Sequence, residues 1–263
     1  MPPLPDALAK LRSHLEYQKE IGARDTEVSP ETLARFAQRL KQRAATPVSA
    51  PAMMPARPAR APARPEVGNP AADSLAAIAA EVAACRACRL CEKRTQVVPG
   101  QGSTTPEIMF IGEGPGEEED RQGLAFVGRA GQLLTDIIKA MGYTRDEVFI
   151  GNVVKCRPPD NRTPMPDEMA ACIHFLERQI ALLKPRVIVA LGATAVKGLF
   201  NDPKISITRI RGTWRSYQGI DTMPTLHPAY LLRNPPAKKD VWEDMKAVLK
   251  HLGRPIPDRA RSK

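Results

Sequence analysis

The chain has 263 residues, enough for one sizeable domain with additional segments. Lys and Arg outnumber Asp and Glu by 39 to 29, which gives a formal net charge of +10. This excess favours binding to a polyanion, because each neutralised phosphate releases condensed counterions, although basic ribosomal and membrane-surface proteins share it. No apolar run approaches the ~20 residues of a membrane-spanning helix, which excludes an integral membrane protein.

The compartment is predicted from the N-terminal sequence. MPPLPDALAKLRSHLEYQKE lacks a basic stretch followed by an apolar core, so we expect no secretory signal and a cytoplasmic, nucleoid-associated monomer. Thiols stay reduced in the cytoplasm. The five cysteines therefore need an explanation other than disulfides, and metal binding is the first candidate.

The composition changes along the chain. Apolar residues recur at helical spacing over residues 1–45, which predicts a helical extension that packs on the parent domain or on an unidentified protein partner. Residues 46–72 are dominated by Pro and Ala with interspersed Arg, which predicts a disordered linker. Residues 73–255 are predicted to form the main domain, and residues 256–263 a basic tail.

Apolar runs and helical periodicities alternate within the main domain. Strands are predicted at 108–111, 148–154, 187–191 and 223–226, and helices at 133–141, 167–183, 193–200 and 241–252. This alternation indicates an α/β fold in which a mostly parallel sheet is covered on both faces. Ligands bind beyond the carboxyl ends of the strands in such sheets, and each motif below lies at such an end.

Four cysteines have a spacing typical of a metal site. Cys85 and Cys88 form a C-x-x-C pair, Cys156 follows a predicted strand, and Cys172 lies on the next predicted helix. Two close ligands and two distant ones tie a leading segment to the body of a domain. Four thiolates suit either tetrahedral zinc or a [4Fe–4S] cluster, and the spacing alone does not decide between them.

Cys91 extends the pair to C-x-x-C-x-x-C. The position at which a bacterial ferredoxin run has its next cysteine is Thr95 here, so we interpret Cys91 as a bystander thiol. Unliganded buried cysteines are the alternative for the whole set.

Two glycine-rich segments follow the first predicted strand. The run from Gly112 to Gly116, with Glu113 and Gly114 inside it, lets the backbone turn sharply and approach a ligand. A phosphate-binding loop is one interpretation, but no Walker Lys-Ser/Thr follows, and four consecutive acids would repel phosphate. In the second segment, Phe126 suits either stacking on a base or packing in the core.

Polar and apolar side chains follow later strands. The amide of Asn152 matches the donor and acceptor pattern of uracil and not of cytosine, although it also suits a structural hydrogen bond. His227, fixed by the following proline, can donate to a developing anion. Leu231, Leu232 and Arg233 form either a wedge for a base stack with a phosphate-binding cation, or the buried start of a helix.

Together and in this order, these motifs resemble the family 4 uracil-DNA glycosylases, the iron–sulfur branch of the uracil glycosylase superfamily. The resemblance covers about residues 85–252 and rests on GEGPGEEED, GLAFVGRAGQLL, GNVVKCRPPDNRTP, VIVALGATA, HPAYLLRN and the helix with Cys172. It implies a three-layer α/β/α sandwich that hydrolyses the N-glycosidic bond of deoxyuridine in DNA, leaving an abasic site for base excision repair. It also implies a [4Fe–4S] cluster with four ligands, Cys85, Cys88, Cys156 and Cys172.

The resemblance assigns roles to individual residues. The implied uracil-binding residues are Glu113, Gly114, Phe126, Asn152 and His227, of which Glu113, Asn152 and His227 are catalytic. The implied DNA wedge and backbone contacts are Leu231, Leu232, Arg233 and Arg129. His227 would face O2 of the departing uracil, where a preorganised donor is worth ~3–4 kcal/mol.

The group that positions the hydrolytic water is left open. The best-known branch of the superfamily uses an aspartate for this and a tyrosine to exclude the thymine methyl, and these places fall on Gly114 and Gly116. The candidates here are Asn152 and Glu113, with Glu119 more distant.

Two alternatives come from other functional classes. One is a uracil-DNA binder that captures its target through a histidine in an inserted Arg-rich loop, but residues 160–163 contain no histidine. The other is a repair adaptor with a zinc or iron–sulfur site and an inactive pocket. The presence of Glu113, Phe126, Asn152 and His227 argues against it. We therefore predict an active glycosylase.

Overall fold

The computed structural model describes residues 73–257. The helical extension predicted over 1–45, the linker predicted over 46–72 and most of the predicted basic tail lie outside the described residues. None of the described helices is long and apolar enough to cross a membrane.

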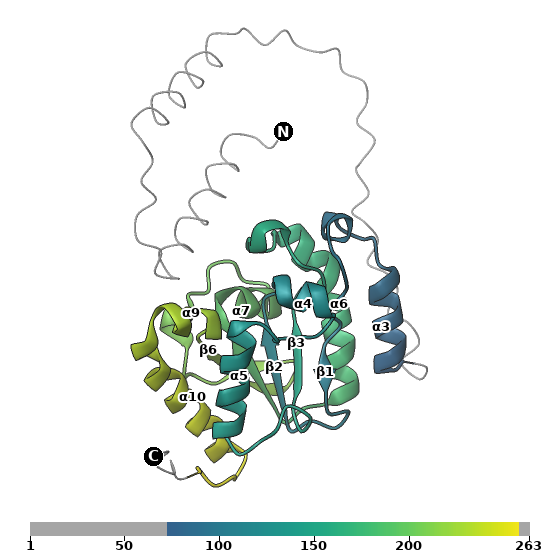
Figure 1. The fold of residues 1–263 in the computed structure, drawn as a ribbon. Helices are drawn as coiled ribbons and strands as arrows, with labels where there is room; N and C mark the ends of the chain where they lie inside the picture. Colours follow the sequence, from purple (N-terminus) through teal and green to yellow (C-terminus); the bar gives the residue numbers. More distant parts are fainter. Residues whose placement is uncertain (1–72, 258–263) are drawn as a thin grey trace, which may run out of the picture. The chain divides into compact units, whose positions relative to one another are not determined.

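A six-stranded sheet lies at the centre of the described residues, with strand order β1-β3-β2-β4-β6-β5 (Figure 1). The strands are β1 Gln101–Gly102, β2 Ile108–Gly112, β3 Phe149–Asn152, β4 Val187–Leu191, β5 Arg215–Tyr217 and β6 Ile220–Thr225. β3, β2, β4 and β6 are parallel, whereas β1 and β5 pair antiparallel at the two edges. The prediction of a mostly parallel sheet is confirmed.

Helices connect the parallel strands. The α-helices are α3 Leu75–Ala84, α4 Glu117–Gln122, α5 Arg129–Ala140, α6 Pro166–Leu183, α7 Gly192–Phe200, α8 Ile207–Ile210, α9 Pro228–Arg233 and α10 Lys238–His251. Short 3₁₀ helices are η2 Arg89–Glu92, η3 Pro159–Asn161 and η4 Pro235–Ala237. α3 contacts α6 and α6 contacts α7, while α5 contacts α9. Connections between parallel strands are right-handed as a rule, and the connection from β2 to β3 crosses the sheet in the opposite direction to the one from β3 to β4. α5 and α9 therefore lie on one face and α3, α6 and α7 on the other, which gives the three layers.

Local sequence explains where the elements start and end. Every residue of β2 and β4 is buried, as expected for strands covered on both faces. α6 starts at Pro166, whose missing N–H is tolerated in a first turn, and the side chain of Glu168 accepts from the backbone N–H of Met165 at 2.8 Å. The predicted helix over 167–183 therefore matches α6 closely.

The sequence prediction missed both edge strands and the helices α3, α4 and α8. The edge strands β1 and β5 have two and three residues, too few for an alternating pattern to be recognised. α3 was also missed, and its position depends on a distant cation. Arg178 of α6 donates to both carboxylate oxygens of Asp73, at 2.8 and 2.6 Å, and to Glu81 at 2.7 Å. These bonds hold α3, and with it the cysteine segment that follows, against α6.

Candidate active site

The predicted site residues follow strands that end at the same edge of the sheet. β2 ends at Gly112, which is paired in register with Asn152 at the end of β3. β6 ends at Thr225, two residues before His227. Because β2, β3 and β6 are parallel, these three ends lie together, as predicted for a ligand site in this type of sheet.

Gly112 lies where two side chains converge. A Cβ atom on Gly112 would lie 2.5 Å from Oδ1 of Asn152 and 2.5 Å from Cζ of Phe126, so any side chain there would have to displace both. The ring of Phe126 in turn lies 5.6 Å from the ring of His227, with an angle of 34° between the planes. The structure thus brings Asn152, Phe126 and His227 together above the end of β2.

Asn152 is buried, with 1% of its surface exposed. Its side-chain oxygen has no hydrogen-bond partner among the described residues. A buried acceptor without a partner is rare and costs stability, so its persistence points to a ligand that donates to it. The structural role that the sequence left open, a satisfied amide, does not fit this oxygen.

His227 is held as a neutral donor. It caps the N-terminus of α9, where its Nδ1 accepts from the backbone N–H of Ala229 at 3.1 Å. The proton of the neutral ring is therefore on Nε2, which is free of this bond. Burial, with a contribution from the nearby charge of Arg233, lowers the pKa of His227 to about 4. Gly192 lets α7 approach, because a Cβ there would lie 2.9 Å from Cβ of His227.

Glu113 and Gly114 form the turn that leaves β2. The carbonyl of Glu113 accepts from the backbone N–H of Val154 at 3.1 Å. A Cβ on Gly114 would lie 2.6 Å from Cγ2 of Val154, and the rings of Pro158 and Pro164 lie beyond it at 3.8 and 4.0 Å. Close packing thus requires glycine at 114, in the position where the resemblance implies a pocket lining.

Glu119 supports a loop. Its Oε1 accepts from the backbone N–H groups of Val127 at 2.9 Å and Gly128 at 2.8 Å. These bonds engage one of its two carboxylate oxygens. Glu119 thus has a structural part in the site, because it holds the backbone that follows Phe126.

The predicted DNA contacts divide into buried and exposed residues. Leu231 is completely buried, whereas Leu232 is 37% exposed on the same short helix. Arg233 and Arg129 are exposed, as phosphate contacts must be. Leu231 packs in the core of this structure, so Leu232 is the leucine of the pair that is exposed for the predicted wedge.

The cysteines surround one small hollow. It is lined by Cys85, Cys88, Cys91, Cys156 and Cys172, together with residues that include Arg94 and Lys155. All five thiols are free of disulfides, and Nη1 of Arg94 donates to Sγ of Cys156 at 3.1 Å. Within residues 73–257, however, no three metal-binding side chains are placed to hold a single ion. The position of Cys91 in the lining does not separate it from the other four.

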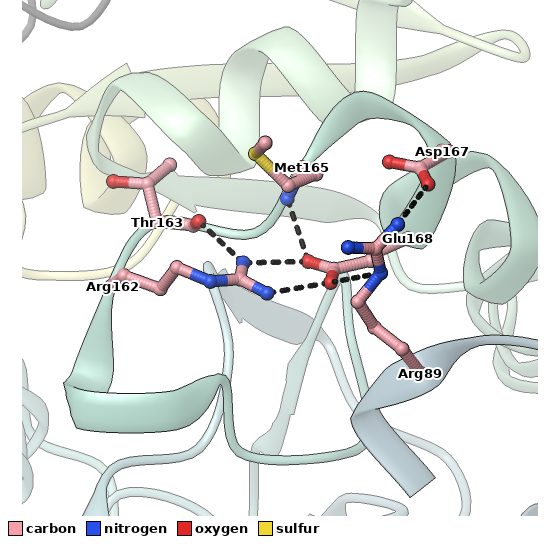
Figure 2. A network of polar contacts seen from close by, with 6 residues as sticks. All are labelled: Arg89, Arg162, Thr163, Met165, Asp167 and Glu168. Atoms are coloured by element: carbon pink, nitrogen blue, oxygen red, sulfur yellow. Dashed lines mark hydrogen bonds and ion pairs between the residues drawn. The ribbon is translucent and has the colours of Figure 1, made fainter. Parts of the chain in front are cut away.

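A polar network connects this cysteine segment to the loop beside Gly114 (Figure 2). The buried carboxylate of Glu168 accepts two hydrogen bonds from Arg162, at 2.8 and 2.7 Å, and lies 3.8 Å from Arg89. Burial alone would raise the pKa of Glu168, but the bonds from Arg162 and Met165 outweigh it, and the pKa lies below its usual value. α6, the 157–164 loop and η2 are thereby held together.

Comparison with known proteins adds the family. A model of the uracil DNA glycosylase superfamily matches residues 99–246, more than half of the chain. The chain is 53% identical over 160 residues to a type-4 uracil-DNA glycosylase of Thermotoga maritima, covering 60% of this chain and 82% of that protein. It is 48% identical over 184 residues to a type-4 uracil-DNA glycosylase of Sulfurisphaera tokodaii, covering 67% and 84%.

The chain belongs to the type-4 branch of the uracil DNA glycosylase superfamily. The family resemblance predicted from the motifs is confirmed. A type-5 uracil-DNA glycosylase of Thermus thermophilus is more distant, at 32% identity over 117 residues, covering 39% of this chain and 53% of that protein.

The sequence did not identify two residues of this uracil DNA glycosylase site, Arg145 and Gln101. Arg145 donates to the carbonyls of Ala125 at 2.6 Å and Phe126 at 3.0 Å, and Gln101 accepts from the backbone N–H of Ala125 at 3.1 Å. Neither lies in a recognisable motif, because each acts on backbone atoms about 20 residues away. The only sequence signal is the three glycines around Phe126, at 123, 128 and 131, which indicate that other parts of the chain approach this backbone closely.

Proposed function

We propose that this chain is an active uracil-DNA glycosylase, which hydrolyses the N-glycosidic bond of deoxyuridine in DNA and leaves an abasic site. The observation that carries the proposal is the convergence of Asn152, Phe126 and neutral His227 at one edge of the sheet. Family membership and the names of the type-4 relatives support it.

Each of these side chains has a part in the reaction. The ring of Phe126 stacks on an extruded base, and the unpartnered Oδ1 of Asn152 accepts from the imide N–H that distinguishes uracil from cytosine. Breaking the glycosidic bond moves negative charge onto the leaving base. Nε2–H of His227 then donates to O2 of the uracil anion, and a neutral donor avoids transferring its proton completely.

Water attack on the sugar requires an oriented acceptor. Asn152 or Glu113 is the proposed group, whereas Oε1 of Glu119 accepts from the backbone N–H groups of Val127 and Gly128. Extruding the base costs a few kcal/mol, which the exposed Leu232 and the cations Arg129 and Arg233 offset by filling the base stack and holding phosphates.

A nicking assay tests the proposed function. The purified chain is incubated with a labelled oligonucleotide that contains one uracil, and alkali then cleaves the strand at any abasic site. Cleavage only at the uracil position is expected, and an otherwise identical oligonucleotide with thymine is the control. Uncut uracil DNA at stoichiometric enzyme would leave the non-catalytic uracil-binding or adaptor function as the better interpretation.

We also propose that the cysteine hollow holds a [4Fe–4S] cluster, with Cys85, Cys88, Cys156 and Cys172 as ligands and Cys91 outside the set. The fit is supported by five free thiols around one hollow and by a guanidinium, Arg94, directed at Cys156, because a cation stabilises thiolate. The cluster would supply a cross-link between the α3–η2 segment and α6.

Replacing each cysteine with serine distinguishes ligands from the bystander. Cys85→Ser, Cys88→Ser, Cys156→Ser and Cys172→Ser are each expected to lose bound iron and the brown absorbance near ~400 nm. Cys91→Ser is the matched control and should keep both. Iron per chain and the absorbance spectrum are the measurements. Loss of iron in Cys91→Ser, with retention in one of the other four, would contradict the proposed ligand set.

The two neighbouring leucines of α9 provide a matched test of the wedge. Leu232→Ala is expected to lower single-turnover release of uracil from duplex DNA by about tenfold, with less effect on single-stranded DNA, because only a duplex must be opened. Leu231→Ala should instead lower the free energy of unfolding by about 2–5 kcal/mol. Equal activity losses on both substrates in Leu232→Ala would argue against a wedge.

Location and assembly are further proposals. The net charge of +10 supports association with the nucleoid in the cytoplasm, and we propose that the chain acts as a monomer on uracil-containing DNA. Residues 73–255 would form the catalytic domain, residues 46–72 a linker, and residues 1–45 the site for a separate protein partner. Proteins pulled down by the full chain are compared with those pulled down by a variant that lacks residues 1–45, and the partner is expected only with the full chain.

A further inference from the structure

The backbone of Phe126 adopts a conformation that an aromatic residue rarely takes. Its φ angle is +53°, in the left-handed region, although no glycine stands at this position. Such a conformation persists only where surrounding contacts determine it, and it is common where function requires a particular side-chain direction. Here it turns the ring of Phe126 toward Asn152 and His227.

Side chains from three separate segments hold the four residues around this strained point. Glu119 of α4 accepts from the N–H groups of Val127 and Gly128, directly after Phe126. On the other side, Gln101 of β1 accepts from the N–H of Ala125. The N–H groups flanking Phe126 are thus each fixed by a side-chain oxygen.

Arg145 holds the two carbonyls of the same segment. Its Nη2 donates to the carbonyl of Ala125 at 2.6 Å, and its Nη1 donates to the carbonyl of Phe126 at 3.0 Å and to Oγ1 of Thr135 at 3.0 Å. The bond to Thr135 anchors the guanidinium to α5, and Arg145 itself is partly buried. A planar fork that reaches two consecutive carbonyls fixes the two peptide groups that flank the Cα of Phe126.

α5 closes the remaining side of the loop. A Cβ atom on Gly131 would lie 2.0 Å from both the carbonyl carbon and the carbonyl oxygen of Phe126, so the helix lies directly against this peptide. The peptide group of Phe126 is therefore packed against α5 and bonded to Arg145. A small rotation of it would swing the ring out of line with His227.

We propose that Arg145 is a positioning residue of the glycosylase, which sets the plane of the Phe126 ring against the base and acts only through that ring. The inference rests on the proposed function. The guanidinium of Arg145 is directed at the carbonyls of Ala125 and Phe126, and its effect on the reaction is transmitted by these two groups. Small displacements of a positioning group can cost up to ~10²-fold in rate.

A double-mutant cycle tests the proposal, since residues that act as a unit have non-additive effects. Single-turnover uracil release is measured for wild type, Arg145→Met, Phe126→Ala and the double variant. Arg145→Met is expected to slow release by about 10–10²-fold in the wild-type background and by less than about twofold when Phe126→Ala is already present. Inhibition by free uracil should weaken in parallel, because the stacked product loses its platform.

Two further variants separate positioning from folding. Arg145→Lys keeps one donor but not the fork, so its rate should lie between wild type and Arg145→Met. Arg186→Met removes a cation that precedes β4 and pairs with Glu107, at the amino ends of the strands and away from the site. It should leave uracil release unchanged. Thermal unfolding of each variant shows whether it is folded. If Arg145→Met does not fold, Arg145→Lys takes its place in the double-mutant cycle.

The outcomes distinguish this inference from the function on which it rests. Equal slowing by Arg145→Met with and without Phe126→Ala, in an active wild type, would overturn the positioning role and leave the glycosylase assignment intact. A wild-type chain that releases no uracil would overturn both. Non-additive slowing with an intermediate Arg145→Lys establishes the role.

Discussion

Replacing His227 with asparagine is expected to slow single-turnover uracil release by about 10²–10³-fold, the usual cost of removing one preorganised donor to a developing anion. Nε2–H of His227 is the donor available for O2, because Nδ1 is bonded to the backbone N–H of Ala229. Asparagine can still cap that N–H but cannot place a donor at the Nε2 position. The rate of alkali-sensitive strand formation measures the effect.

His227→Ala separates the cap from the chemistry. Alanine removes both, so His227→Ala should lose activity to a similar extent and also lose about 1 kcal/mol of unfolding free energy, whereas His227→Asn should keep its stability. A His227→Asn variant with wild-type rate would show that the leaving base is stabilised by another group.

The pKa of His227 adds a test by pH. Since burial lowers it to about 4, the ring stays neutral from pH 8 down to about pH 5, and the rate should show no loss from its titration near its ordinary pKa of 6.5. The unfolded chain binds a proton at this residue between about pH 6.5 and 4, and the folded chain does not. Stability should therefore decline as pH falls through this interval, less so in His227→Asn. A rate that drops near pH 6.5 in wild type alone would contradict a neutral donor.

Much of the site could be predicted from sequence because its residues lie next to strand ends. β2 and β3 are apolar, continuously buried runs, so Glu113 and Asn152 could be placed at their carboxyl ends before the structure was known. Two polar side chains on adjacent parallel strands must come together, whatever the intervening loops do.

Other features depend on long-range contacts that leave no local pattern. Leu231 and Leu232 are identical in type, and only the packing of α9 on α5 determines which is buried. Arg145 is an ordinary charged residue in sequence, and its importance comes from carbonyls 19 and 20 residues earlier. The clustering of Cys91 with the other cysteines likewise depends on how α3 is held by Arg178.

Asn152→Ala is expected to lower activity strongly without lowering stability, whereas an ordinary core substitution lowers stability. The side-chain oxygen of Asn152 is buried without a partner among residues 73–257, so its removal relieves a cost in the folded state and breaks no bond of that oxygen. The unfolding free energy should therefore stay within about 0.5 kcal/mol of wild type or rise. Uracil release should fall by about 10²-fold or more, because the imide N–H of the substrate then has no acceptor.

Asn152→Asp is the isosteric companion to this variant. A carboxylate can accept from the imide N–H but cannot donate to O4 of uracil, so this variant should also lose activity while retaining the shape of the pocket. Release from the same oligonucleotide under single-turnover conditions, with denaturant unfolding in parallel, is the measurement. A large loss of stability in Asn152→Ala with little loss of activity would mean that the amide is structural. Preserved stability with lost activity instead means that the fold maintains an unpaired acceptor at the end of β3 for the base that enters the site.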